Sequence, residues 1–295
     1  MLIDLHSHTT ASDGGLTPQE LVFRAENKQL ALLAITDHDT TDGVALAQKT
    51  ASKLTIVPGT EISTAWHAFD IHIVGLNIDL DNAVLQAALT EQREKREQRA
   101  VEMGRRLAKA GYPDVYEEAK QVAGSAPVTR SHFAKVLVRR GVADNPAKVF
   151  DKFLRRGNTG YVPNNWMSIA EAVKVIQQAG GQAVLAHPTN YRLSNKWLRK
   201  LVAEFASAGG DAIEVAAPQL NREVQQFVAD LAEEHGLLAS QGTDFHHPSA
   251  WRELGRGLHL PQKCQPIWQD WTHYEVLQSQ TEAAPEANTA GKEGL

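Results

Sequence analysis

A series of short apolar segments, each carrying a histidine or a carboxylate near its end, constrains this chain more than any other feature. The first segment, at residues 2–5, is followed by His6 and His8. In a strand, side chains two residues apart point to the same face, so these two imidazoles converge on one point. Asp13 follows, just before Gly14, where the chain can turn. Converging imidazole and carboxylate groups suit a divalent metal ion, although a single His-x-His pair also fits a polar strand end.

The pattern recurs along the chain. Further apolar runs lie at residues 32–35, 55–60, 70–74, 183–186 and 237–243. The ligand-type residues that close or interrupt them are His38, Glu61, His72, His187, Asp244 and His246. Because the carboxyl ends of parallel strands meet at one edge of a sheet or one mouth of a barrel, the repetition predicts an α/β fold. The fold would be a parallel barrel or an open sheet with its site at that end.

The candidate metal ligands share nitrogen and oxygen donors and include no thiolate. They are His6, His8, Asp13, His38, Glu61, His72, His187, Asp244 and His246. This set exceeds the needs of one ion and suffices for two or three if a carboxylate such as Glu61 bridges. Such ligands suit Mn²⁺, Fe²⁺ or Zn²⁺. Adjacent divalent ions can bind phosphate oxygens and activate a shared water, so the chemistry needs no serine or cysteine nucleophile.

Chain length and composition indicate the number of domains and the cellular compartment of the protein. The chain has 295 residues, of which 42% are hydrophobic, enough for one large or two modest domains. Its single cysteine, Cys264, excludes an internal disulfide and fits a reducing compartment. Asp4 and His6 interrupt any N-terminal signal peptide, and the apolar run Leu30–Ile35 is too short to cross a bilayer. We therefore expect a soluble cytoplasmic protein that does not associate with membranes, and no obligate protein partner is evident.

Charge is unevenly distributed. The net charge of -5 conceals a segment, residues 93–156, that holds 16 Lys and Arg against eight Asp and Glu. A basic segment on an acidic protein favours a phosphate-bearing partner. The alternative is a helical surface whose arginines are merely solvated.

The order of predicted elements divides the chain. Residues 1–81 and 166–277 alternate strands with helices at α/β spacing, and we expect them to form one discontinuous domain. Residues 82–165 read as a helical insertion that contains the basic segment. Residues 278–295 have almost no large apolar side chains and are predicted to be a disordered tail.

Individual elements follow from local patterns. The longest predicted helix spans residues 83–109, with Gly104 as its weakest point. Shorter helices are expected at 115–122, 131–140 and 146–155. A strand is expected at 160–162, and residues 62–78 read as two strands with a turn near His67.

Six motifs, in this order, resemble the PHP (polymerase and histidinol phosphatase) superfamily from Met1 to about residue 260. They are Asp4-Leu5-His6-Ser7-His8, Asp13-Gly14, Thr36-Asp37-His38-Asp39, Pro58-Gly59-Thr60-Glu61, His187-Pro188 and Gly242-Thr243-Asp244-Phe245-His246. The resemblance implies a distorted βα barrel of about seven strands, with a helical insertion and a trinuclear site of three Mn²⁺ at its mouth. By position, one ion would be held by His6, His8, Glu61 and Asp244. A second would be held by Glu61, His72 and His187, and a third by Asp13, His38 and His246.

Within that superfamily the chain most resembles the RNase AM, or 3',5'-nucleotide bisphosphate phosphatase, type. Residues 10–14, the helical insertion and residues 130–134 carry this resemblance. It implies a phosphoesterase that hydrolyses 5'-phosphorylated nucleotides, 3',5'-nucleotide bisphosphates and short RNAs from the 5' end, by attack of a metal-activated water. The implied catalytic residues are Glu61, Asp244 and His246. The implied substrate-binding residues are Ser12, Arg130, His132 and Arg192.

Three alternatives stay open. A phosphatase for a small molecule such as histidinol phosphate would share the metal site. An amidohydrolase also begins a barrel with His-x-His, but no lysine stands at a strand end where it could bridge two metals. A non-catalytic scaffold would be expected to lose ligands, and none is lost here. Asp37 and Asp39 flank His38 and are expected to orient ligands. The remaining histidines outside the site are expected to be solvated or structural: His67, His235, His247, His259 and His273.

Overall fold

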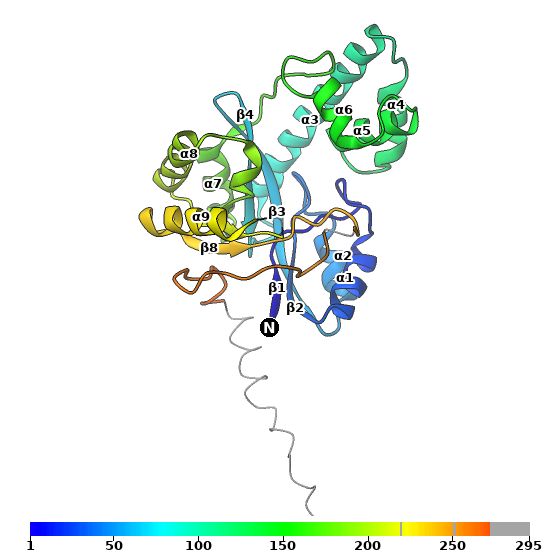
Figure 1. The fold of residues 1–295 in the computed structure, drawn as a ribbon. Coiled ribbons are helices and arrows are strands. Elements are labelled where there is room, and N and C mark those ends of the chain that lie inside the picture. Colours follow the sequence, from blue (N-terminus) through cyan, green and yellow to red (C-terminus); the bar gives the residue numbers. More distant parts are fainter. Residues whose placement is uncertain (219, 250–251, 272–295) are drawn as a thin grey trace, which may run out of the picture.

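The computed structural model describes residues 1–218, 220–249 and 252–271 (Figure 1). The predicted tail at 278–295 lies outside the described residues, as does His273. The N-terminal half contains β1 (Leu2–Asp4), α1 (Pro18–Asn27), β2 (Leu30–Ile35), α2 (Val44–Thr50), β3 (Thr55–Trp66), β4 (Phe69–Leu76), α3 (Ala83–Lys109), α4 (Val115–Ala123) and α5 (Arg130–Arg139). Then follow α6 (Pro146–Val149), the π-helical turn η1 (Phe150–Leu154), β5 (Met167–Ser168), α7 (Ile169–Gln178), β6 (Gln182–Leu185), the 3-10 turn η2 (Pro188–Tyr191), α8 (Asn195–Ser207), β7 (Ala212–Ala216), α9 (Arg222–Glu234) and β8 (Leu238–Gln241).

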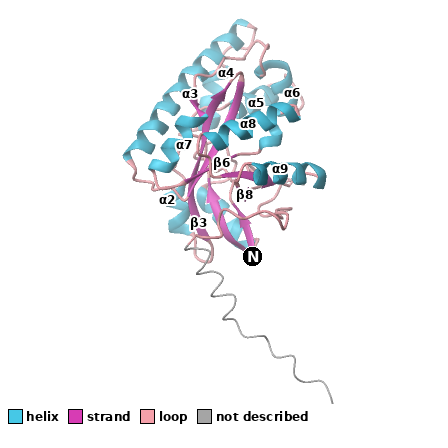
Figure 2. Ribbon diagram, turned by 90° about the vertical axis from the view of Figure 1, so that its left-hand side faces the viewer, coloured by secondary structure: helices cyan, strands magenta, loops and turns pink. Residues whose placement is uncertain are grey.

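The strands form one mixed sheet, which confirms the predicted α/β class. Its order is β1-β2-β3-β4-β6-β7-β8, with β5 paired to β3. Every pairing is parallel except those of β4, which runs antiparallel to both β3 and β6. Helices α1 and α2 lie to one side of the sheet, and α7, α8 and α9 lie to the other (Figures 1 and 2). No helix in the described part of the chain is long and apolar enough to cross a membrane.

The two ends of the strand path, β1 and β8, lie close together. The Leu5 amide donates to the Gln241 carbonyl at 3.1 Å. Beyond the strands, Ser7 and Phe245 form a parallel bridge. These contacts bring the segments after β1 and β8 to the same end of the sheet. The closed, distorted barrel stays a prediction.

Two local predictions were wrong. The strand expected to end at Glu61 continues to Trp66, because β4 pairs with it from Gly59 to its last residue. No strand forms at 160–162. There, the carbonyls of Tyr161 and Val162 accept hydrogen bonds from arginines of α3 instead of from a neighbouring strand.

The helical insertion has an apolar cluster of its own. Helices α4, α5 and α6 pack with η1 against the second half of α3, around Leu107, Phe133 and Phe153. The first half of α3 buries Leu85 and Leu89 in the cluster between the sheet and α7. The predicted helix at 146–155 is split into α6 and η1. Helix α3 therefore belongs to both apolar clusters, and the predicted domain boundaries stay a prediction.

Gly104 tests the packing of the insertion. A Cβ at this position would lie 2.4 Å from the Cβ of Tyr116 on α4. Helix propensity alone would make Gly104→Ala stabilising by about 1 kcal/mol. We expect the clash to reverse the sign and lower the free energy of unfolding by about 1–3 kcal/mol in urea denaturation. Gln98→Ala, at an exposed position of the same helix, should change it little. A Gly104→Ala protein at least as stable as wild type would contradict this packing.

Candidate active site

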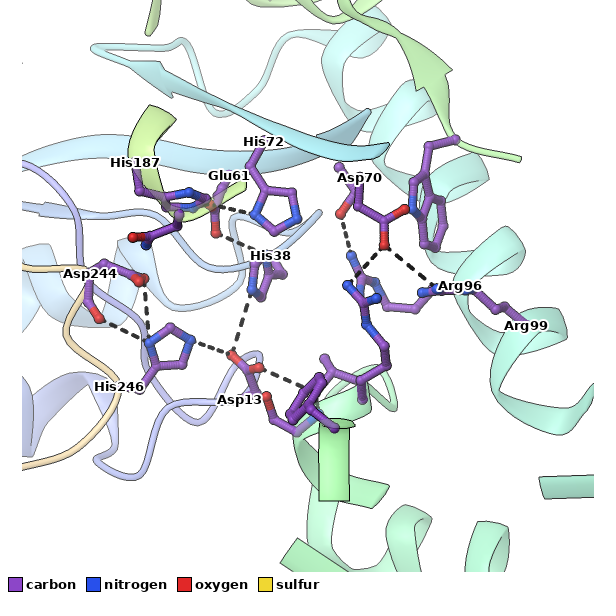
Figure 3. Close-up of a pocket in the computed structure, with 17 residues that line it drawn as sticks. Asp13, His38, Glu61, Asp70, His72, Arg96, Arg99, His187, Asp244 and His246 are labelled. Atoms are coloured by element: carbon purple, nitrogen blue, oxygen red, sulfur yellow. Dashed lines mark hydrogen bonds and ion pairs between the residues drawn. The ribbon is translucent and has the colours of Figure 1, made fainter. Parts of the chain in front are cut away.

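The predicted ligands converge where the strands end. They surround a cavity of about 230 Å³ between the sheet and helix α3 (Figure 3). Seven of the nine candidates line it: Asp13, His38, Glu61, His72, His187, Asp244 and His246. His6 and His8 lie fully buried behind them.

Glu61 lies at the centre of the histidine cluster. Its Oε1 is 2.9 Å from His72 Nδ1 and 2.9 Å from His187 Nε2. Its Oε2 is 2.9 Å from His38 Nδ1. Glu61 lies inside β3, and the neighbouring antiparallel strand β4 carries His72. The continuation of β3 beyond Glu61 thus shapes the site.

The second centre is where His6 and His8, in the segment that follows β1, meet Asp244. His6 Nε2 is 3.4 Å from Glu61 Oε1, and His8 Nε2 is 3.3 Å from Glu61 Oε2. Asp244 Oδ1 lies 3.6 Å from His6 Nε2, 3.3 Å from His8 Nε2 and 3.4 Å from His246 Nδ1. The two Nε2 atoms are only 3.2 Å apart. Their lone pairs and the carboxylate oxygens therefore face one small volume.

Asp13 forms the third centre. Its Oδ1 is 3.3 Å from His246 Nε2 and 3.9 Å from His38 Nε2. Its Oδ2 accepts a hydrogen bond from the Thr129 hydroxyl at 3.2 Å. Thr129 also caps helix α5, so the insertion contacts the site directly.

The donor set fits a divalent metal. Three groups have ligand atoms within 4.8 Å of one another: His6, His8 and Glu61; His38, Glu61 and His72; and His8, Asp13, His38 and His246. Among the described residues, several buried atoms of the cluster lack any hydrogen bond, including Asp13 Oδ1, His38 Nδ1 and Glu61 Oε2. Buried polar atoms are rarely left unpaired. Convergent, unpaired oxygen and nitrogen atoms are the ligands that metal ions take.

The cluster keeps its carboxylates ionised. Burial alone would raise the pKa of Glu61, but His38, His72 and His6 hold it well below its usual range. Burial opposes ionisation of Asp13 too, and His246 and His38 hold its pKa well below the usual range. Anionic carboxylates are the form that binds metal.

Two further carboxylates, which sequence reasoning missed, hold the ligands in place. Glu214 Oε1 lies 2.6 Å from His6 Nδ1, and Glu214 Oε2 accepts the His187 amide at 2.5 Å. Asp4 accepts the Thr243 amide at 2.9 Å and so fixes the segment that carries Asp244. Carboxylates behind ligating histidines commonly set their orientation. Glu214 could have been found as the one acid in the buried run Ala212–Ala216.

The segment after β8 is held by close packing and an unusual backbone. A Cβ on Gly242 would lie 2.3 Å from the Cβ of His6, so only glycine lets this segment approach the segment that follows β1. Asp244 and His187 have positive φ angles of 50° and 29°. Such angles cost energy in non-glycine residues and are concentrated at functional sites.

Ser12 and His132, predicted to bind substrate, do not line the cavity. The Ser12 hydroxyl is buried and donates to Asp37 Oδ1 at 2.6 Å. His132 Nδ1 accepts the Thr129 amide at 3.0 Å as part of the cap of α5. Burial lowers the pKa of His132 to about 4. In the structure, Ser12 contacts Asp37 and His132 contacts Thr129, and both of these partners lie next to the histidine cluster.

The two predicted phosphate-binding arginines are separated. Arg130 lines the cavity beside the histidine cluster, and its Nη2 is 2.9 Å from Asp70 Oδ2. Arg192 lines a neighbouring cavity that also contains Arg130. Of these two predicted arginines, only Arg130 therefore lies beside the histidine cluster.

Helix α3 contributes residues that sequence reasoning missed. Arg96 and Arg99 are buried, and their guanidinium carbons lie 5.0 Å and 5.5 Å from the ring centroid of Trp166. Arg96 forms an ion pair with Asp39, and Arg99 Nη2 lies 3.6 Å from Asp70 Oδ2. Figure 3 shows Asp70, Arg96 and Arg99 on the side of the cavity opposite Asp244. Arginines three residues apart, on one face of a helix, were the available signal.

Known proteins have sequences similar to this one. A family model described as the PHP domain matches residues 4–154. The chain is 50% identical over 275 residues to "5'-3' exoribonuclease Rnm" of Escherichia coli (strain K12), covering 92% of this chain and 94% of the relative. It is 40% identical over 272 residues to "3',5'-nucleoside bisphosphate phosphatase" of Chromobacterium violaceum, covering 91% and 95%.

Solved structures share the fold. One, from Chromobacterium violaceum, is described as an amidohydrolase with bound sulfate and no metal. It has a TM-score of 0.86 and 39% identity, covering 95% of this chain and 97% of the other. Another, from Bifidobacterium adolescentis and assigned as a metal-dependent phosphoesterase, has a TM-score of 0.75 and 27% identity, covering 94% and 95%. The sequence match and the histidine–carboxylate cluster agree: the chain belongs to the PHP domain family and is a hydrolase of phosphate esters.

Proposed function

We propose that the chain hydrolyses 5'-phosphorylated nucleotides, 3',5'-nucleotide bisphosphates and short RNAs from the 5' end, using manganese. One observation carries the metal-dependent part: the Glu61 carboxylate lies within 3.4 Å of five imidazoles, a position suited to a bridging ligand. The names of relatives at 40–50% identity support the nucleotide part.

The proposed metal sets follow the three centres of the cluster. His6, His8, Glu61 and Asp244 would hold one ion, with Glu61, His72 and His187 on a second and Asp13, His38 and His246 on a third. When bound, divalent ions activate water and neutralise charge on phosphate oxygens. The nitrogen and oxygen donors also admit Fe²⁺ or Zn²⁺. Glu61, Asp244 and His246 would be the catalytic residues, because they face the cavity where a reacting phosphate would lie.

Arginines beside the cluster would orient the substrate. Arg130 faces the cavity and can grip a phosphate with two parallel hydrogen bonds. Arg99 Nη2 is buried there without a hydrogen-bond partner among the described residues. Asp70 lies between these arginines, within 2.9 Å of Arg130 and 3.6 Å of Arg99. A substrate phosphate would compete with Asp70 for them and position the ester bond beside Glu61.

The sheet and the helices of residues 82–165, which surround the site, support two structural proposals. We take the sheet to be a distorted barrel, because the segments after β1 and β8 bond to each other. We take residues 82–165 to be a cap inserted into that barrel, because α4, α5 and α6 have their own apolar cluster. The amidohydrolase alternative requires a lysine that bridges two metals. Among the described residues, no lysine lines the cavity.

The first test is a substrate panel with metal-loaded protein. We expect a 3',5'-bisphosphate nucleotide and a 5'-phosphorylated RNA to be hydrolysed far faster than histidinol phosphate. Glu61→Gln should lower kcat/KM for the nucleotide substrates at least about 100-fold, because the bridging carboxylate is lost. The control is His247→Ala, an exposed residue outside the cavity, which should stay near wild type. Preference for histidinol phosphate, or equal losses in the two variants, would reject the proposal.

A second test concerns Arg130. Arg130→Ala should reduce kcat/KM roughly 10- to 100-fold for both the bisphosphate nucleotide and the RNA, because it removes a charge-assisted contact to phosphate. Arg139→Ala, an exposed arginine on the same helix α5, is the matched control. Steady-state kinetics on both substrates would measure the loss. An Arg130→Ala protein with the kinetics of its control would remove Arg130 from the substrate site.

A further inference from the structure

A second cavity adjoins the catalytic one. Its volume is about 430 Å³, and it shares Asp70, Arg130 and Asn190 with the catalytic cavity. Its other lining residues are Ala68, Phe69, Arg155, Arg156, Tyr161, Tyr191 and Arg192. We call this second cavity the arginine groove. The two cavities therefore lie next to each other, on either side of Arg130 and Asp70.

The arginine groove is strongly basic. Arg155 and Arg156 follow η1 in the helical insertion, while Arg192 follows η2 on the other side. Within the described part of the chain, neither Arg156 nor Arg192 has a carboxylate at salt-bridge distance, and both are exposed. Arg155 pairs with Asp151, and 43% of its side chain is exposed. Cations from two segments therefore face one cavity with little acidic compensation.

Aromatic rings accompany these cations. Tyr161, Tyr191 and Phe69 line the groove. The ring of Phe69 lies 6.3 Å from that of Trp197 on α8, which is 39% exposed and has Lys200 5.2 Å over its face. Tyr191 is fixed in place, since its hydroxyl accepts the His72 amide and donates to the Ala186 carbonyl, both at 2.9 Å. The aromatic surface thus continues from the groove to the outside of the molecule.

We propose that the arginine groove binds the part of a single-stranded RNA that lies beyond the nucleotide held in the catalytic cavity. This inference rests on the proposed function. Guanidinium groups bind successive phosphates, and exposed aromatic rings stack bases without regard to sequence. An acidic peptide would use the arginines but not the aromatic rings. On this proposal a mononucleotide would occupy the catalytic cavity without needing the groove, so the groove would distinguish chains from mononucleotides.

The experiment compares two substrates across two variants of the full-length, metal-loaded protein. The variants are Arg155→Gln with Arg156→Gln, and Trp197→Ala. The matched control is Lys109→Gln with Arg139→Gln, a pair of exposed cations on the same insertion that line neither cavity. The substrates are a 5'-phosphorylated oligoribonucleotide and a 3',5'-bisphosphate mononucleotide. Trp197→Phe, which keeps a ring, separates stacking from a folding defect.

We expect KM for the oligonucleotide to rise about tenfold in each groove variant, the size of one lost phosphate or stacking contact. KM for the mononucleotide should stay within about twofold, and Trp197→Phe should recover most of the loss. The salt dependence of oligonucleotide binding should flatten by about 0.7 in the log–log slope for each arginine removed. The control pair should behave as wild type.

Three results would overturn the inference: groove variants that match the control pair, equal losses on both substrates, or Trp197→Phe as defective as Trp197→Ala. A wild-type protein that does not cleave the oligonucleotide at all would instead reject the proposed function. The failure of the groove and the failure of the function are therefore distinguishable.

Discussion

The burial of one carboxylate among histidines is the interaction on which the rest of the site depends. Glu61 is fully buried and lies close to His72 of β4, to His38 in the segment after β2 and to His6 in the segment after β1. An isolated carboxylate in such a place would become protonated, because burial disfavours its charge. The surrounding imidazoles reverse that tendency and keep the pKa of Glu61 low. The same anion then requires partners of opposite charge, which metal ions supply.

The sheet makes this burial possible. Parallel strands bring His6, His38 and His187 to one end, and the antiparallel strand β4 adds His72 beside Glu61. Asp4 and Glu214 fix the ligands from behind. Helix α3 then places Arg96 and Arg99 across the cavity from Asp244 (Figure 3). The sheet and helices α3 and α5 meet at the cavity, so each contributes one wall of the site.

Much of the site could be predicted from the sequence, because ligand-type residues at strand ends leave a periodic trace. The nine candidates were found this way, and the structure brings them together. Arg96, Asp70 and Glu214 were missed because their sequence signals are weaker: their role depends on which face of α3, β4 or β7 points inward, and tertiary packing decides that. The role of Ser12 in substrate binding stays a prediction, and its hydroxyl donates to Asp37, a contact that also depends on tertiary packing. The pattern predicted two strands with a turn near His67, but it did not show that the first of them is continuous with the strand that carries Glu61.

The manganese content of a Glu61→Gln variant tests the central claim most directly. Purified wild-type and variant proteins would be loaded with manganese, dialysed and measured by elemental analysis, with circular dichroism to verify the fold. We predict about two to three ions per chain in the wild type and about one in the variant, because the bridging carboxylate serves two of the proposed ions. A folded Glu61→Gln protein that retains the wild-type manganese content would contradict the account.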